Sequence, residues 1–214
     1  MTESNGLRER KKRRTHEAIL NAALALFVEH GFDQVSITQV AEAAEVSRRT
    51  LFSYFPTKED LVTFRLSDHE TESARVVRAR PSGQAPVEAL REHYLDALAR
   101  RDPITGLTDL EPALQLFRLI MTTPSLLESM LTFKDNGERA LAEALRDTAG
   151  LADLPSRLAA AQVVAVVWTL ALENQRRIVD GARADDVYPD AVAAAELGFA
   201  QLAGALGVVA AEHP

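Results

Sequence analysis

Two adjacent arginines, Arg48 and Arg49, lie in a short segment that is rich in hydroxyl side chains. A guanidinium can donate two hydrogen bonds to O6 and N7 of guanine, and hydroxyl groups can contact phosphate oxygens. The segment begins at Ser47, and the free N–H groups at the start of a helix attract phosphate. These residue types therefore indicate that the segment from Ser47 to Tyr54 contacts DNA.

Short helices must position these side chains. Ser36 followed by Gln39 is a capping box, which predicts a helix from Ser36 with an apolar face built from Ile37, Val40, Ala41 and Ala44. Ser47 caps a second helix, in which Leu51 and Phe55 form the buried side and which Pro56 closes. Thr57 and Asp60 repeat the capping pattern, so a third helix is predicted from Thr57 to about Arg78. Two short helices joined by a tight turn are the geometry of a helix-turn-helix.

A basic segment precedes this motif. Residues 8–14 include six arginines and lysines and lead into an amphipathic helix that Gly31 ends as a left-handed C-cap. Such an arm can neutralise phosphates or enter a minor groove. A disordered, solubilising terminus is the alternative interpretation of the same charges.

The motifs resemble a known family. An amphipathic helix ending in Gly-Phe is followed by V-A-x-A-A, then V-S-x-x-T-L, then F-x-Y-F-x-x-K-E-D-L. This order is similar to the N-terminal DNA-binding domain of the TetR family of bacterial transcription regulators, over about the first third of the chain. The resemblance implies an all-helical homodimer whose C-terminal domain binds a small molecule that controls DNA affinity. It also implies a repressor that its ligand releases.

The resemblance assigns roles to individual residues. Ser36 and Ser47 would cap helices with or without DNA, Lys58 could be a solvated first-turn residue, and Phe52 could pack inward. The predicted DNA contacts are Arg13 and Arg14 in the arm, Ser36 and Thr38 at the first motif helix, Ser47, Arg48, Arg49, Thr50, Phe52 and Ser53 at the recognition helix, and Tyr54 and Lys58 on phosphates.

Three positions depart from the family pattern. Glu45 stands at a turn position where the family usually has glycine, so a residue with a Cβ must adopt a left-handed conformation that costs roughly 1–2 kcal/mol. Arg49 replaces a residue that is usually small, which favours a guanine contact in each half-site. Phe52 replaces a common tyrosine and keeps an apolar surface for a thymine methyl group.

Composition limits the other classes of function. The chain has 214 residues, a net charge of −7 and no cysteine, so we expect a cytoplasmic protein without disulfides or thiol chemistry. We expect no membrane-spanning run and no signal peptide. No common catalytic or nucleotide-binding motif is present, and we predict neither an enzyme nor a cofactor. Glu92, His93 and Asp96 are close enough on a helix to bind a metal, but a solvated helix face is the simpler explanation, and no metal site is predicted.

The rest of the chain reads as helices separated by proline and glycine. We predict an all-α protein of about nine helices, with a DNA-binding domain over residues 1–58 and an effector-binding and dimerisation domain over residues 59–214. Helices are expected from Pro86, from Leu110 to about Met121, from near Pro124 to Gly150, from Pro155 to Gly181 and from Pro189. The last two are apolar nearly all round, which predicts a four-helix dimer interface; a monomer core is the alternative.

A ligand pocket is predicted among the central helices, where bulky apolar residues meet isolated polar ones. The alternative is ordinary core, because a Phe or Met at helical spacing belongs to the core more often than it lines a cavity. The candidates are Tyr94, Phe117, Arg118, Met121, Met130, Phe133, Gln162, Trp168 and Asn174, and they favour a hydrophobic or amphipathic small-molecule effector. Besides a repressor, the sequence leaves open an activator of the same fold, an architectural or protein-interaction module, or an enzyme without a recognisable motif.

Overall fold

A computed structural model of the chain describes the backbone of residues 2–211 and the side chains of residues 10–203. Within these residues the chain is helical and contains no strand. Contacts divide it into two compact units. The N-terminal unit comprises Met1–Arg65 and Gln115–Met130, and the C-terminal unit comprises Leu66–Leu114 and Leu131–Pro214. The predicted all-α fold is confirmed.

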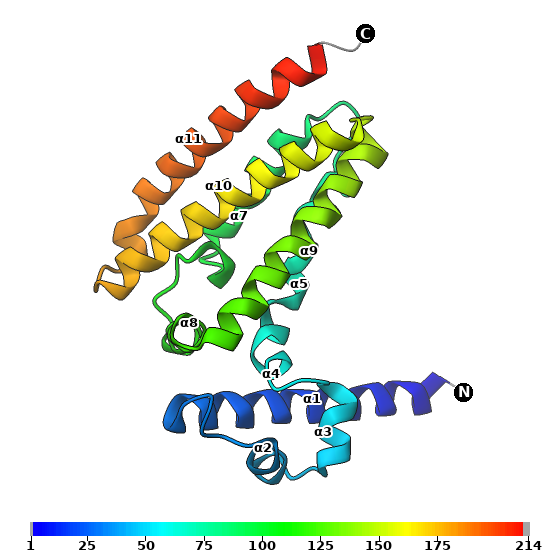
Figure 1. Cartoon of the computed structure of the whole chain (residues 1–214), viewed down its shortest axis with the longest axis vertical. Coiled ribbons are helices and arrows are strands. Elements are labelled where there is room, and N and C mark those ends of the chain that lie inside the picture. Colours follow the sequence, from blue (N-terminus) through cyan, green and yellow to red (C-terminus); the bar gives the residue numbers. More distant parts are fainter. Residues whose placement is uncertain (1, 212–214) are drawn as a thin grey trace. The chain divides into compact units, whose positions relative to one another are not determined.

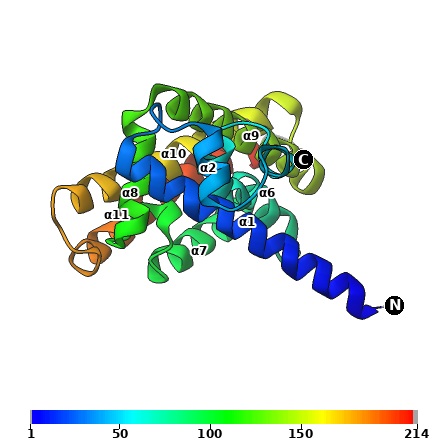
Figure 2. The ribbon, with the colours of Figure 1, turned by 90° about the horizontal axis from the view of Figure 1, so that it is seen from below.

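The N-terminal unit is organised around one long helix. Helix α1 (Thr2–His30) packs against α2 (Ile37–Ala43) and α4 (Asp60–Thr63), and α2 packs against α3 (Arg48–Tyr54). Figure 1 shows α2 and α3 on the side of α1 opposite α4, and Figure 2 shows α1 continuing past α2 toward the N-terminus. The helices meet over a fully buried apolar centre that includes Ile19, Phe27, Val40, Leu51, Phe55 and Leu61.

The segment after the motif is not the single helix that the sequence predicted. The Thr57–Asp60 capping pair forms, with Thr57 N donating to Asp60 Oδ2 at 2.8 Å and Asp60 N donating to Thr57 Oγ1 at 3.1 Å. Four short helices then follow: α4, the 3-10 helix η1 (Phe64–Leu66), α5 (Ser67–Glu70) and α6 (Glu72–Ala79). The prediction was wrong because it considered only local sequence patterns. In the structure α4 packs against α1 and α6 packs against α7, so the two ends of the segment have different packing partners and the helix is broken between them.

The C-terminal unit is a bundle of longer helices. Helix α7 (Pro86–Ala99) packs against α11 (Ala184–Ala211), which in turn packs against α10 (Asp153–Val179), as Figure 1 shows. The 3-10 helix η2 (Pro103–Thr105) lies in the predicted loop after α7 and contacts α10. Helices α8 (Glu111–Thr122) and α9 (Pro124–Ala149) begin and end close to their predicted bounds. Each of them contributes residues to both units.

Two predicted helix starts were wrong. Helix α10 begins at Asp153 and α11 at Ala184, ahead of Pro155 and Pro189. Pro155 is the third helical residue, where a missing N–H breaks no helical hydrogen bond. The first turn of α11 forms before Pro189 because Ala184 and Val187 are buried in the core, and Ala184 N donates to Asp109 Oδ2 at 3.1 Å. If the four segments over residues 60–79 count as one broken helix and the three-residue η2 is left out, the described residues form the nine helices predicted.

One expectation about membranes needs correction. Helix α10 is long and apolar enough to cross a membrane by length and composition, although the sequence analysis expected no such run. Its residues Ala159, Ala160, Val163 and Ile178 are nevertheless part of the packed core of the C-terminal unit. A single helix of this length and composition is weak evidence for a membrane span, because core helices of helical bundles meet the same criteria.

Three helices end in the same hydrogen-bonded motif. After α2, Glu45 N donates to Glu42 O at 3.0 Å and Val46 N to Ala41 O at 2.9 Å, which is a Schellman motif. The same pair of bonds ends α7 at Arg101 and α10 at Gly181. The central residue is left-handed each time, with φ of 54° at Glu45, 57° at Arg101 and 98° at Gly181. The strained conformation predicted at Glu45 is therefore confirmed.

Candidate DNA-binding site

Helix α3 presents its two arginines to solvent because its opposite side is anchored in the core. Leu51 and Phe55 are fully buried, whereas Arg48 and Arg49 are exposed at the N-terminal end. Phe52 is 43% exposed, so it lies on the outer face and not in the core. The buried and exposed residues alternate with the helical period, and α3 is therefore fixed with its basic end outward.

The hydroxyl groups around α3 are engaged in capping. Ser47 Oγ accepts a hydrogen bond from Thr50 N at 3.0 Å, and Ser53 Oγ donates to Thr50 O at 2.6 Å. Ser36 forms the complete predicted capping box with Gln39, since Gln39 N donates to Ser36 Oγ at 3.2 Å and Ser36 N donates to Gln39 Oε1 at 2.8 Å. Thr38 is half-buried on the first turn of α2. These caps fix the starts of both motif helices, and phosphate contacts from the same hydroxyls stay a prediction.

Lys58 has a structural role that the sequence analysis did not identify. Its ammonium donates to Phe32 O and lies 4.3 Å from the centroid of the Phe32 ring and 5.6 Å from that of Phe27. Burial lowers the pKa of Lys58, and the nearby Asp33 and Glu59 oppose this shift. The side chain thus closes the loop between α1 and α2, while its predicted contact with phosphate is not tested.

An aromatic cluster supports the end of α3. The His16 ring lies 4.2 Å from the Phe64 ring, 4.7 Å from that of Phe55 and 6.0 Å from that of Tyr54, measured between centroids. Burial lowers the pKa of His16, so the neutral ring is favoured. The sequence analysis missed His16, although it stands three residues before the buried Ile19 on the apolar stripe of α1.

The basic arm is a helix continuous with α1. Residues 10–14, which include Arg13 and Arg14, are all exposed. Successive helical residues are turned by about 100°, so the five charges surround the helix axis and only some can face one surface. Arg8, which the sequence analysis placed in the arm, lies outside the residues whose side chains are described.

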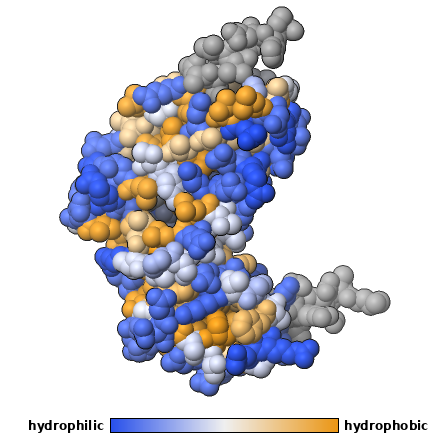
Figure 3. All heavy atoms as spheres, in the orientation of Figure 1, coloured by the Kyte–Doolittle hydropathy of each residue, from blue (hydrophilic) through white to orange (hydrophobic). Residues whose placement is uncertain are grey.

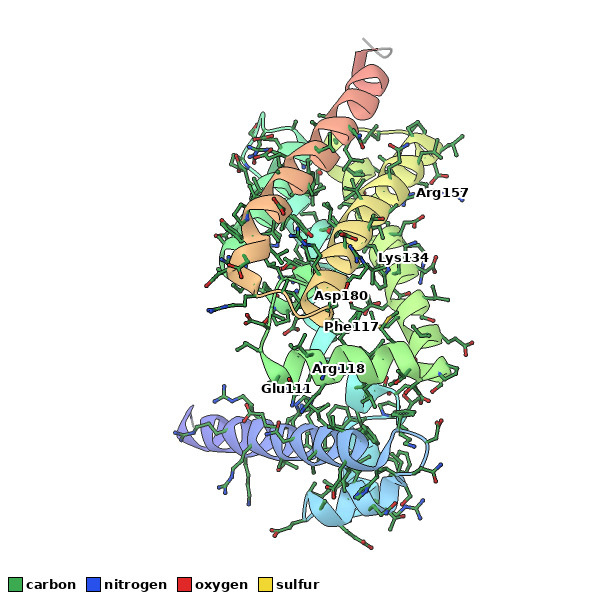
Figure 4. The ribbon with its side chains drawn as sticks, turned by 90° about the vertical axis from the view of Figure 1, so that its left-hand side faces the viewer. Glu111, Phe117, Arg118, Lys134, Arg157 and Asp180 are labelled. Carbon is green, nitrogen blue, oxygen red and sulfur yellow. The ribbon has the colours of Figure 1, made fainter. Side chains whose placement is uncertain are left out.

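The predicted pocket residues are divided between the two units. In the C-terminal unit, Tyr94 and Asn174 are buried, Phe133 and Trp168 are half-buried and Gln162 is exposed. Asn174 Nδ2 donates to Thr105 O at 2.9 Å and so holds η2 on α10. The other four belong to the N-terminal unit: Met130 is buried, Phe117 half-buried, and Arg118 and Met121 exposed, with Phe117 and Arg118 consecutive on α8 (Figure 4).

Comparisons with known proteins agree with this geometry. Residues 19–63 match the sequence profile described as bacterial regulatory proteins, tetR family. The chain is 32% identical to the HTH-type transcriptional repressor KstR of Rhodococcus jostii over 168 residues, which cover 77% of this chain and 72% of KstR. The chain belongs to the TetR family. TetR-family proteins are DNA-binding transcriptional regulators, so α2 and α3 form the helix-turn-helix.

One further relative in sequence and two solved structures also align with much of this chain. The regulator TcmR of Streptomyces glaucescens is 32% identical over 147 residues, or 68% of this chain and just under two thirds (65%) of TcmR. Salmonella enterica GusR has the same fold, with a TM-score of 0.55, 23% identity and coverage of 90% of this chain and 95% of GusR. NalD, the secondary repressor of a multidrug efflux pump in Pseudomonas aeruginosa, also aligns with a TM-score of 0.55, at 20% identity over 87% of this chain and 96% of NalD.

Proposed function

We propose that the protein is a cytoplasmic, homodimeric repressor that leaves its double-stranded DNA operator when an apolar or amphipathic small molecule binds. The observation that carries this proposal is helix α3, which exposes Arg48 and Arg49 while Leu51 and Phe55 anchor it. The names of KstR and NalD describe repressors, which supports repression as the direction of control.

In the proposed complex, Arg48 and Arg49 contact base edges, and Arg13, Arg14 and Tyr54 contact the phosphate backbone. Arg49 is exposed one turn before Ser53, on the face of α3 that the core leaves open. An arginine that binds guanine through two hydrogen bonds discriminates between bases by about 1–3 kcal/mol. The half-sites should therefore contain a G·C pair opposite Arg49.

The test uses duplexes selected from a random library and fluorescence anisotropy at several salt concentrations. Arg49→Ala should weaken binding about tenfold or more and relax the preference for guanine, whereas Arg49→Lys should retain affinity better than specificity. Arg139→Ala is the matched control, because Arg139 is an exposed arginine on α9, outside both α3 and the helices of the proposed dimer interface. Equal losses for both variants, or selected sites without guanine, would reject the base contact. Uniform binding to any duplex would instead favour an architectural protein.

The proposed dimer interface lies on α10 and α11. Leu154 and Leu158 on α10 are 60% and 53% exposed, and Leu197 on α11 is 61% exposed. Leu172 and Val179 continue the exposed apolar residues along α10. Figure 3 shows apolar patches that interrupt the polar surface over these helices. A second copy that covers these side chains would remove them from water and place two α3 helices on one duplex.

Sedimentation tests the dimer directly. Leu158→Glu with Leu197→Glu should give a monomer at micromolar concentration, because four carboxylates would be buried in the interface. The matched control is Leu131→Glu, which makes the same change at a leucine that is 65% exposed on α9. A wild-type chain that sediments only as a monomer, or a double variant that stays dimeric, would reject this interface.

The proposed effector site uses Tyr94 as its polar anchor. The Tyr94 hydroxyl is buried and has no hydrogen-bond partner among residues 10–203, and its ring lies 5.8 Å from that of Phe199 between centroids. A buried, unpaired hydroxyl is destabilising, so an effector oxygen that accepts its hydrogen bond would bind favourably. In a thermal-shift screen, ligands of this kind should stabilise the wild type more than Tyr94→Phe. Equal stabilisation of both proteins would place the effector elsewhere.

A further inference from the structure

A charge cluster ties together four successive elements of the C-terminal unit. His69 Nδ1 of α5 lies 2.7 Å from Glu72 Oε2 at the start of α6. The other oxygen of the same carboxylate, Oε1, lies 3.0 Å from His93 Nε2 of α7. His69 Nε2 lies 4.0 Å from Oδ1 of Asp102, the residue that caps η2. One carboxylate thus bridges two imidazoles that come from different helices.

The cluster is shielded enough for its charges to interact. The side chains of His69 and Glu72 are 24% and 23% exposed, and that of Asp102 is 20% exposed. The hydrogen bond to Glu72 raises the pKa of His69, and the charges of Glu72, Asp102 and Asp68 add to this effect against burial. Burial alone would raise the pKa of Glu72, but the hydrogen bonds from His69 and His93 outweigh it and hold that pKa well below its ordinary value.

Each element packed against His69 contributes a defined set of groups. Besides Glu72 and His93, Arg100 at the end of α7 lies 3.8 Å from Asp102 through its Nη2 atom. Helix α9 approaches α5 through Gly137, where an added Cβ would come within 2.8 Å of Glu70 O. Arg100 pairs with Asp102 and not with His69, whose own charged neighbours are the acidic Glu72, Asp102 and Asp68. The protonated form of His69 is therefore the one that the site stabilises.

The cluster follows directly after the segment of chain that connects the two units. The chain leaves the N-terminal unit through α4 and η1. A 3-10 segment between two α-helices often marks a hinge. The helix is interrupted again at Thr71 between His69 and Glu72. At its other end the segment is fixed, because Arg80 Nη2 donates to Thr148 O at 2.8 Å and Nη1 donates to Thr148 Oγ1 at 2.6 Å. His69 and its partner Glu72 lie at the end of the segment nearer to η1.

We propose that His69, Glu72 and His93 form a proton-sensitive latch that holds α5 and α6 on α7 and η2, and thereby makes DNA affinity depend on pH. With His69 protonated, the carboxylates of Glu72 and Asp102 hold a cation between them. These ion pairs stabilise the packing of α5 and α6 fully below about pH 6.5, the ordinary pKa of histidine. Their contribution is lost as the pH rises through the higher pKa of folded His69. Alkaline solution therefore loosens the residues that follow the hinge.

Hydrogen exchange of the full chain tests the latch without DNA. Protection factors of amides 67–79, corrected for intrinsic exchange, should be about fivefold higher at about pH 6 than at about pH 8. His69→Gln should abolish this difference, and Glu72→Gln should return the His69 pKa, read by NMR, toward its ordinary value. The matched control is His30→Gln, at a histidine in the N-terminal unit that pairs with Glu29 at 3.7 Å and should leave the difference intact.

Two results would overturn the proposal. One is a wild-type segment whose protection does not change with pH, or a His69→Gln variant that keeps the change. The other concerns regulation: affinity for a selected duplex should vary more with pH in the wild type than in His69→Gln. Equal variation in both proteins would reject the link to DNA while leaving the repressor function itself untouched.

Discussion

Replacement of Glu45 by glycine should stabilise the DNA-binding unit. Glu45 has a φ of 54°, and both of its neighbouring Schellman hydrogen bonds are made by backbone atoms alone. The left-handed conformation lowers the folding stability by roughly 1–2 kcal/mol for a residue with a Cβ, and glycine avoids this cost. Glycine also increases the conformational entropy of the unfolded chain, which lowers the stability by about 0.4–1 kcal/mol. The net gain expected for Glu45→Gly is therefore about 0.5–1 kcal/mol.

Urea unfolding followed by far-ultraviolet circular dichroism measures this gain. The single tryptophan, Trp168, lies in the C-terminal unit, so its fluorescence separates the unfolding of that unit from that of the N-terminal one. Glu45→Gln keeps the Cβ and removes only the charge, and it should leave the stability nearly unchanged. If Glu45→Gln stabilises the protein as much as Glu45→Gly, the gain comes from the charge at the end of α2 and the strain argument is refuted.

The same motif elsewhere in the chain provides two further controls. Gly181→Ala places a Cβ at the equivalent position of α10, where nothing lies within 4 Å of it, so the loss of about 1 kcal/mol reports the backbone conformation alone. Arg101→Gly should not repeat the gain at Glu45. The Arg101 guanidinium lies 4.0 Å from the centroid of the Tyr188 ring and donates to Asp185 Oδ1 at 2.8 Å, and both contacts would be lost.

Three further changes have defined outcomes. Since burial lowers the pKa of folded His16, the N-terminal unit should lose stability as the pH falls through about 6.5, and His16→Phe should remove this loss in urea titrations at two pH values. Lys58→Ala should cost about 1 kcal/mol of stability even without DNA, because it removes the bond to Phe32 O; an unchanged melting temperature would contradict the contact. Arg80→Ala should lower the stability by about 2 kcal/mol and increase the hydrogen exchange of amides 72–79. Loss of exchange protection in α9 alone would show that Arg80 does not fix α6.

The sequence by itself determined the local parts of the DNA-reading unit. Capping boxes, the closing proline and the strained turn depend on residues three to five positions apart, so Ser36, Ser47, Pro56 and Glu45 were predicted correctly. The alternation of buried Leu51 and Phe55 with exposed Arg48 and Arg49 also follows from the helical period alone. The order of these motifs was enough to place the chain in its family.

Only the tertiary structure decided where helices break and which polar groups meet. The segment over residues 60–79 is broken because its parts pack on different partners, and Pro189 lies inside α11 because Ala184 and Val187 are buried before it. His69 and Glu72 are three residues apart, but His93 and Asp102 lie more than 20 residues further along the sequence, so no periodicity joins them to this pair. The packing of α5, α6, α7 and η2 nevertheless brings the four side chains within hydrogen-bond or ion-pair distance. Local rules act over a few residues, whereas burial selects among the alternatives that those rules allow.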